Sequence, residues 1–414
     1  MGLFEDFIAR GLIKQATNEE KIKDLLDNDK ITFYIGFDPT ADSLHVGHLL
    51  QIITAMRLQR YGHNAILLIG DATASVGDPS GKTDMRKMLS SDDIDINASK
   101  ISKQIFNLIY NNTIVNNKGS CNFINNSDWF DTVNYLSFIR DIGQHLSVNT
   151  MLRADCFKSR MDNGLSFLEF NYMAMQAFDF LQLNTQENCV LQIGGDDQWS
   201  NILAGINLIH KKSNRDTFGL TLPLLLNSNG TKMGKTEKGA VWLDKNKTSV
   251  FDFFQFWRNL PDADVINCFK LLTFMYVEKI KNIPFNNAEE INNAKMTLAT
   301  LITTIVHGED EANAAATQSI NLFKNHSFDD MVAINLDPDT NYSVIDLLIT
   351  AKFAKSKTEA RNLIENNGIS ITDPLDNSKF RIIESPEVLV SRIHFKHFII
   401  KKGKKSFFKF SFIE

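Results

Sequence analysis

The first half of the chain alternates short apolar runs with a segment of helical periodicity. Residues 31–37 and 65–70 are apolar runs of the length typical of buried strands. Between them, apolar side chains recur at helical spacing from Leu49 to Tyr61 and stop at Gly62, a residue suited to ending a helix. Strand, helix and strand in this order predict a βαβ unit and therefore a parallel sheet.

The same pattern returns after residue 185. Residues 189–193 predict a strand, Gly194-Gly195 a turn, and residues from about 198 to 212 a helix. Two such halves predict a Rossmann-like, doubly wound α/β domain over residues 1–226, with ligand in the crevice at the carboxyl ends of the strands. Between the halves, residues 85–165 are rich in Asn and predict an inserted helical segment.

The remaining sequence predicts two further parts. Residues 227–325 should form an α-helical domain, because strand patterns are absent from position 249 onward. Residues 326–342 are polar, contain a proline and lack periodicity, so we expect a linker there. In residues 343–414, two short helices followed by β-rich sequence predict a small α+β module.

Composition narrows the class of protein. Of 414 residues, 43% are apolar and 22% are charged, values that are ordinary for a globular protein of two or three domains. Apolar runs stay shorter than the roughly 18 residues needed to span a bilayer, and the acidic start does not match a targeting peptide. The four cysteines are widely spaced, which favours reduced thiols in a cytoplasmic protein over disulfides or a zinc site. We therefore expect no membrane association and no dedicated metal site.

Charge is distributed unevenly along the chain. Residues 343–414 contain 13 Lys/Arg and 8 Asp/Glu, a net charge of +5, whereas the remainder contains 31 and 41, a net charge of −10. A basic module on an acidic body is typical of a polyanion-binding unit. A solvated basic surface explains the charge equally well.

The segment from His45 to His48 combines two imidazoles with a glycine at a predicted helix start. Gly47 allows the backbone to approach a ligand, and the free N–H groups of a helix N-terminus favour an anion. Thr40, in the preceding turn, adds a hydroxyl. Two surface histidines at a helix start are the alternative. The turn that precedes them favours a phosphate site.

A second candidate phosphate segment runs from Lys232 to Thr236, after the turn Asn229-Gly230. Its two lysines, Lys232 and Lys235, suit a clamp on pyrophosphate, because an ammonium group needs no bidentate geometry. Lys82 and Arg86 can add positive charge. Any one lysine in a polar loop is usually only solvated, so this interpretation depends on the histidine segment.

Two further segments carry polar side chains suited to a small ligand. Tyr172, Gln176 and Asp179 share one face of a predicted, largely apolar helix, where burial is costly without a polar partner. An amphipathic surface helix is the alternative. The turn Gly194-Gly195 precedes Asp196 and Asp197, whose carboxylates suit a ribose hydroxyl or, alternatively, a helix N-cap.

Together these segments resemble bacterial-type tyrosyl-tRNA synthetases, members of the class I aminoacyl-tRNA synthetases. The resemblance spans essentially the full length and includes signatures of the HxGH and KMSKS type. It is carried by residues 33–48 (FYIGFDPTADSLHVGH), 77–82 (GDPSGK), 166–180 (SFLEFNYMAMQAFDF), 192–199 (QIGGDDQW) and 230–236 (GTKMGKT). The resemblance implies activation of L-tyrosine with Mg²⁺-bound ATP to tyrosyl-adenylate, followed by transfer to the 3′-terminal adenosine of tRNA(Tyr).

The resemblance also implies roles for individual residues. Tyr34 and Asp179 are expected to bind the phenol hydroxyl of tyrosine, and Asp78, Tyr172, Gln176 and Gln198 the rest of the amino acid. The ATP and adenylate site is expected to comprise Gly36, Asp38, Thr40, His45, Gly47, His48, Gly195, Asp197, Gln198, Lys232, Met233 and Lys235. The catalytic groups around the phosphates would be Thr40, His45, His48, Lys82, Arg86, Lys232, Lys235 and Thr236. Ile35, Gln51 and Asp196 depart from some members of the family, which puts direct ATP contacts at 35 and 51 in doubt.

Partners follow from the same resemblance. It implies a homodimer, with the interface in the inserted region at roughly 110–165. It also implies that the C-terminal module binds tRNA, and the expected phosphate contacts are Lys355, Lys357, Arg361, Lys401, Lys402, Lys404 and Lys405. The competing hypotheses are a non-catalytic, synthetase-like RNA-binding protein, a small nucleotidyltransferase that shares HxGH, and a tryptophan-specific relative.

Overall fold

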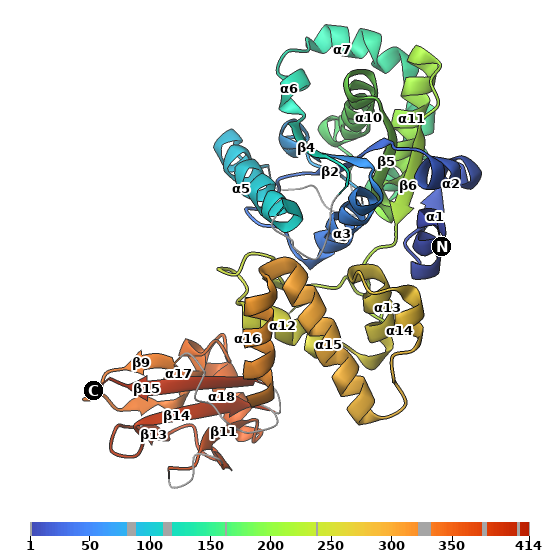
Figure 1. Cartoon of the computed structure of the whole chain (residues 1–414). Helices are drawn as coiled ribbons and strands as arrows, with labels where there is room; N and C mark the ends of the chain where they lie inside the picture. Colours follow the sequence, from blue (N-terminus) through green and yellow to red (C-terminus); the bar gives the residue numbers. More distant parts are fainter. Residues whose placement is uncertain are drawn as a thin grey trace. The chain divides into compact units, whose positions relative to one another are not determined.

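The computed structural model describes residues 2–80, 88–110, 118–161, 164–236, 239–321, 333–374, 379–403 and 406–413. The chain forms two compact units, Met1–Asn313 and Ala314–Glu414 (Figure 1). In the described residues, no helix is both long and apolar enough to cross a membrane.

A six-stranded sheet lies at the centre of the first unit, with strand order β1-β6-β5-β2-β3-β4. All neighbouring strands are parallel except the short edge strand β1. The strands are β1 (Gln15–Ala16), β2 (Thr32–Phe37), β3 (Asn64–Ile69), β4 (Cys121–Asn125), β5 (Cys189–Gly195) and β6 (Phe218–Leu222). The chain builds the sheet outward from β2 in one direction and from β5 in the other. The predicted doubly wound fold is therefore confirmed, and its switch point lies between β2 and β5.

Helices cover both faces of this sheet (Figure 1). On one face, α10 (Phe167–Glu187) and α11 (Trp199–Ser213) pack together over Tyr34, Ile66 and Leu68. Alternate strand residues point to the other face, where α3 (Val46–Tyr61) packs on β3. The predicted helix end is confirmed, because Gly62 caps α3 with a φ of 98°. The remaining helices of this part are α1 (Leu3–Arg10), α2 (Glu19–Asn28), α4 (Asp71–Ala74) and α5 (Ser91–Tyr110).

The inserted segment differs from the prediction in one respect. It contains α5 and the helices α6 (Ser127–Phe130), α7 (Tyr135–Asp141), α8 (Val148–Leu152) and α9 (Asp155–Met161), as expected. It also contains β4, which pairs in parallel with β3 and extends the sheet. The purely helical interpretation of residues 85–165 was therefore wrong. The polar residues Asn122 and Asn125 within β4 conceal the strand pattern at this sheet edge.

Residues 249–321, which the structure describes throughout, contain helices and no strands, as predicted. The helices are α12 (Val250–Arg258), α13 (Asp262–Leu272), α14 (Val277–Lys281), α15 (Ala288–His307) and α16 (Glu309–Ile320). A small hairpin of β7 (Lys235–Thr236) and β8 (Gly239–Ala240) precedes them. Since residues 1–313 form one compact unit, the expected domain boundary at 226 stays a prediction.

The second unit contains a five-stranded sheet with the order β12-β11-β14-β15-β9. The two predicted helices are α17 (Val344–Thr350) and α18 (Lys357–Glu365), and Ser343 and Ser356 cap their N-termini. Strands of this unit are β9 (Ala333–Leu336), β10 (Tyr342–Ser343), β11 (Ile369–Thr372), β12 (Phe380–Ile382), β13 (Leu389–Val390), β14 (His397–Lys402) and β15 (Ser406–Phe412). Strand β9 pairs with β15, so the unstructured linker expected over 326–342 is wrong for residues 333–336.

Candidate active site

A cavity of about 430 Å³ opens at the switch point of the sheet. Its floor comes from the carboxyl ends of β2 and β5, one wall from α10, and its rim from residues 40–48 and 232–234. A cavity of this size accommodates a small polar ligand.

Sixteen of the predicted site residues line this cavity. They are Tyr34, Gly36, Asp38, Thr40, His45, Gly47, His48, Asp78, Tyr172, Gln176, Asp179, Gly195, Asp197, Gln198, Lys232 and Met233. Lys82 and Arg86 lie outside the described residues, as do the side chains of Lys235 and Thr236. Gln51 also lines the cavity, whereas Ile35 is fully buried away from it.

The deep end of the cavity holds a buried polar pair. Asp179 accepts hydrogen bonds from Trp129 Nε1 at 2.9 Å and from Asn126 Nδ2 at 3.2 Å. Burial raises the pKa of Asp179 to about 8, against the opposing effect of these two donors. The Tyr34 hydroxyl is also buried and has no hydrogen-bond partner among the described residues. Burial, followed by the neighbouring Asp179, raises its pKa well above the usual value.

Two carboxylates are fixed closer to the middle of the cavity. Asp38 accepts from the Tyr172 hydroxyl at 2.7 Å and from the Thr73 hydroxyl at 3.0 Å. Asp78 accepts from Gln198 Nε2 at 2.7 Å and from the Ser80 backbone at 2.9 Å. Both carboxylates therefore have defined orientations in a site suited to cationic or hydroxyl groups.

The amide oxygens of Gln176 and Gln192 are buried there as well, without a hydrogen-bond partner in the part of the chain that the structure describes. A ligand with donor groups would satisfy both.

The two histidines cap the start of α3 reciprocally. His45 Nδ1 accepts from the Gly47 backbone at 3.0 Å, and the His45 backbone donates to His48 Nδ1 at 3.2 Å. In the neutral imidazole this arrangement leaves the proton on Nε2, which can donate to an anion. A Cβ at position 47 would lie 2.7 Å from His45 Cε1, so glycine is required for this geometry.

The segment that carries the lysines docks onto the histidine segment. Val241 donates to the carbonyl of Gly234 at 2.8 Å, and Val46 donates to the carbonyl of Val241 at 3.0 Å. Met233 is buried, with its sulfur 3.9 Å from Cys268 Sγ. Lys232 is exposed at the cavity rim. The two predicted phosphate segments therefore belong to one site.

The turn after β5 separates its two acids. Asp197 lines the cavity, and burial, followed by the charge of Asp78, raises its pKa. Asp196 instead accepts from Gln15 Nε2 at 2.7 Å and from the Thr221 hydroxyl at 3.1 Å. Asp196 therefore neither lines the cavity, as a contact with a ribose hydroxyl would require, nor caps the helix that follows.

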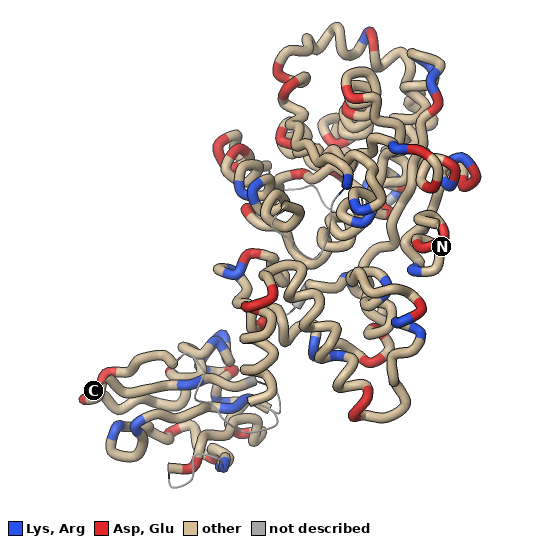
Figure 2. Tube along the Cα trace, in the orientation of Figure 1, with Lys and Arg blue, Asp and Glu red and all other residues tan. Residues whose placement is uncertain are grey.

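The predicted RNA contacts lie on the second unit. Lys357 and Arg361 lie on α18, and Lys355 lies just before its N-cap, Ser356. Figure 2 shows Lys and Arg spread along this unit. Lys401 Nζ lies 5.3 Å from the ring centroid of Phe380, and Lys402 Nζ donates to the Phe353 carbonyl at 2.7 Å. Lys404 and Lys405 lie outside the described residues.

Comparison with known proteins identifies the family. The model of the class I tRNA synthetases for tryptophan and tyrosine matches residues 26–324, and that of the tyrosine–tRNA ligase SYY-like C-terminal domain matches residues 324–410. The chain belongs to the class I tRNA synthetases. A tyrosine–tRNA ligase of Acetivibrio thermocellus is 49% identical over 411 residues, which are 98% of each chain. One of Clostridium kluyveri is 47% identical over 409 residues, with the same coverage.

A solved structure supports the same assignment to the class I tRNA synthetases. The C-terminally truncated mitochondrial tyrosyl-tRNA synthetase of Aspergillus nidulans is 30% identical, with a TM-score of 0.69. The similarity covers 78% of this chain and 94% of that one.

Sequence reasoning missed several residues of this class I site. Asn126 and Trp129 orient Asp179, Thr73 orients Asp38, and Gln192 contributes an amide at the cavity floor. Asn126 immediately follows β4, so recognition of that strand would have placed it at the carboxyl edge of the sheet. Gln192 begins the segment 192–199 that carries the family resemblance, and in the structure it lies opposite Tyr34 in the pairing of β2 with β5.

Proposed function

We propose that the chain is a tyrosine–tRNA ligase, which activates L-tyrosine with ATP and then transfers it to tRNA(Tyr). The observation that carries this proposal is the buried pair of Tyr34 and Asp179 at the deep end of the cavity. A hydroxyl with no partner in the described chain and a carboxylate can together bind the phenol hydroxyl of tyrosine. Phenylalanine would leave the Tyr34 hydroxyl unpaired and would give Asp179 no donor beyond Trp129 and Asn126, and the bulkier indole of tryptophan lacks a hydroxyl.

The other end of tyrosine would meet acceptors for its ammonium group. Tyr172, Gln176 and Asp78 line the cavity between the phenol end and the histidines. Asp38 orients the Tyr172 hydroxyl. Asp38, Asp197 and Gln198 would hold the amino acid and the ribose of the adenylate.

The reaction requires no covalent intermediate on the protein. An oxygen of the tyrosine carboxylate attacks the α-phosphorus, the bond to the β-phosphate oxygen breaks, and pyrophosphate leaves. In the second step, a ribose hydroxyl of the terminal adenosine attacks the tyrosyl carbonyl and AMP leaves. The protein contributes positioning and stabilisation of developing charge.

The phosphate-binding groups would be contributed by two segments. The Nε2–H donors of His45 and His48, the hydroxyl of Thr40 and the ammonium of Lys232 line the same cavity. Lys82, Arg86, Lys235 and Thr236 remain proposed partners of the phosphates. Mg²⁺ would enter bound to ATP, because this ion is usually held by substrate phosphates with one or two carboxylates.

The inserted segment offers a surface for a homodimer. Leu136 is 73% exposed, Tyr135 58%, Val148 55% and Ile139 43%, all on α7 and α8. Clustered exposed apolar side chains are typical of protein interfaces. Light scattering should give the mass of a dimer, and Leu136→Asp should shift it toward the monomer.

The second unit would bind tRNA through its basic side chains, and this binding should weaken with salt. Lys355 and Arg361 are the clearest candidates. Lys357 would first have to leave its ion pair with Asp346, and Lys401 and Lys402 the intramolecular contacts described above. We further propose a cytoplasmic location, because all four cysteines are free and buried.

Tyrosine-dependent exchange between ATP and pyrophosphate tests the first half of this proposal. Exchange should occur with tyrosine and Mg²⁺, and phenylalanine and tryptophan should support little or none. Folded protein that gives no exchange with any of the three would favour a non-catalytic RNA-binding relative.

A further inference from the structure

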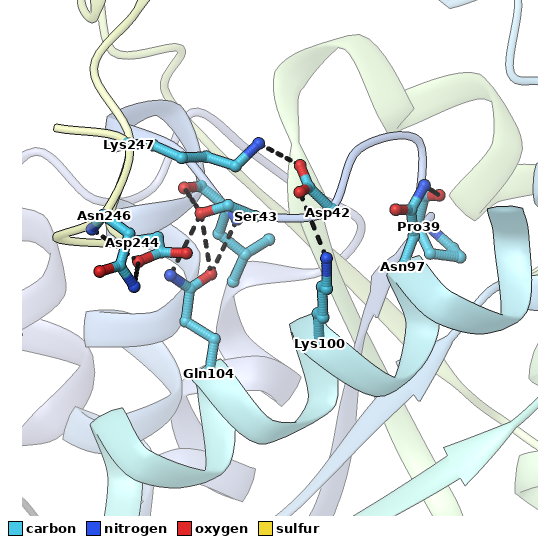
Figure 3. Close-up of polar contacts among 10 residues, drawn as sticks. Pro39, Asp42, Ser43, Asn97, Lys100, Gln104, Asp244, Asn246 and Lys247 are labelled. Carbon is cyan, nitrogen blue, oxygen red and sulfur yellow. Dashed lines mark hydrogen bonds and ion pairs between the residues drawn. The ribbon is translucent and has the colours of Figure 1, made fainter.

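The segment that precedes the histidines is fastened to α5 on one side. Asn97 Nδ2 donates to the Pro39 carbonyl at 3.1 Å, and the Leu44 backbone donates to Gln104 Oε1 at 2.8 Å (Figure 3). Residues 39–44 therefore have a fixed position on the first unit, independent of the segment that carries the lysines.

The same segment is fastened to residues 241–247 on its other side. Leu243 donates to the Leu44 carbonyl at 2.9 Å, which adds to the bonds that join Gly234, Val241 and Val46. A continuous path of backbone hydrogen bonds thus leads from the lysine segment to the histidine segment. The placement of residues 241–247 determines where Gly234 lies relative to His45.

Asp42 and Lys247 form a side-chain link beside this backbone path. Lys247 Nζ forms an ion pair with Asp42 (Figure 3). It also lies 4.8 Å from the ring centroid of Trp242, which is 6.2 Å from the ring centroid of His45. Lys100 of α5 adds a second ion pair to Asp42 at 3.5 Å. The side chains of Asp42 and Lys247 are 34% and 30% exposed, so the pair is only partly screened by solvent.

The link adds a side-chain contact to the backbone hydrogen bonds that already join the two segments. A single partly exposed ion pair contributes little to global folding. Its effect should fall instead on the relative position of the two segments it joins, since residues 39–44 are held separately by α5.

We propose that Asp42 and Lys247 are positioning residues for amino-acid activation, whose ion pair holds the Lys232–Thr236 segment in register with His45 and His48. This inference rests on the proposed function. Neither residue touches the substrates; both act through Trp242 and the backbone path to Gly234.

A double-mutant cycle tests this inference on the full-length protein. Asp42→Asn, Lys247→Met and the double variant are compared in single-turnover formation of tyrosyl-adenylate, together with the affinities for tyrosine and ATP. Each single variant should lower the rate of adenylate formation or the ATP affinity roughly three- to tenfold. In the double variant, the same quantity should fall no further than in the worse single variant. Tyrosine affinity should stay unchanged, and Asp42→Glu should restore most of the rate.

A neighbouring ion pair supplies the matched control. Lys245 lies on the same stretch of chain, but its ammonium pairs at 3.1 Å with Glu311 of α16 and not with Asp42. Lys245→Met should leave adenylate formation unchanged, and melting temperatures show whether any variant is damaged globally. If Asp42→Asn is destabilised, adenylate formation by Lys247→Met is compared with that of Lys245→Met instead.

The outcomes separate the inference from the function on which it rests. Three results would overturn the positioning role alone, provided that the wild type is active. They are unchanged adenylate formation in the Asp42 and Lys247 variants, losses that add in the double variant, or an equal loss in Lys245→Met. Wild-type protein that fails to activate tyrosine would overturn the proposed function and this inference with it.

Discussion

Replacement of Tyr34 by phenylalanine should raise the stability of the free protein and lower its kcat/KM for tyrosine. The side chain is 1% exposed, and its hydroxyl has no protein hydrogen-bond partner in the described structure. The ring packs on Phe180, with centroids 5.3 Å apart, and phenylalanine preserves this contact. Tyr34→Phe therefore removes one hydroxyl and leaves the packing intact.

The magnitudes follow from that single hydroxyl. A neutral hydrogen bond to the substrate contributes about 0.5–1.5 kcal/mol, so kcat/KM for tyrosine should fall roughly 2- to 13-fold. Phenylalanine never makes this bond, so discrimination against it should fall by the same factor. In the free protein, removal of a buried hydroxyl without a protein partner should stabilise the fold by about 1 kcal/mol and raise the melting temperature by about 2 °C.

Two assays check the expected loss of discrimination and the expected gain in stability. Exchange kinetics with tyrosine and phenylalanine give the ratio of kcat/KM values, and calorimetry without substrate gives the melting temperature. An unchanged ratio would refute the assignment of Tyr34 to the phenol hydroxyl. A lower melting temperature would show that the hydroxyl has a partner in the free protein, and the reasoning from its burial would fail.

Three further predictions concern other parts of the site. Because burial raises the pKa of Asp179 to about 8 and a phenol donor favours the ionised carboxylate, tyrosine affinity should rise with pH and level off above about 8; fluorescence titration should show this step in the wild type and not in Asp179→Asn. Gly47→Ala should force the His45 ring from its cap and slow adenylate formation about 100-fold with little change in tyrosine affinity, as for loss of one transition-state donor, and equal losses in both would contradict a transition-state role. Deletion of residues 322–414 should spare exchange and abolish tRNA charging, whereas retained charging would show that the second unit is not the main contact with tRNA.

Local sequence signals predicted the strands β2, β3 and β5 and the helices α3, α10 and α11 because their causes are local, whereas β1, β4 and β6 were not predicted. Gly62 ends α3 because the backbone needs a positive φ there, and the polar stripe of α10 is visible because helical spacing is fixed. The positions of His45–His48 after one strand and of Gly194-Gly195 at the end of another could be predicted for the same reason. The two segments line one cavity because β2 and β5 are adjacent and parallel.

The misses arise from contacts between distant residues. Strand β4 is short, contains asparagines and lies at a sheet edge, so its pattern is weak. Without it, Asn126 could not be placed beside Asp179, which lies 53 residues further along the chain. Strand β9 has four residues and depends on β15, more than 70 residues away, for its only partner. The link between Asp42 and Lys247 spans 205 positions and could not be inferred from either segment alone.

Charging of tRNA with labelled amino acid tests the central claim most directly. Purified protein, ATP, Mg²⁺ and a tRNA(Tyr) transcript should yield tyrosyl-tRNA, with no comparable product from phenylalanine or tryptophan. Charging with tryptophan in preference to tyrosine, or no charging by folded protein with any of the three amino acids, would contradict the account.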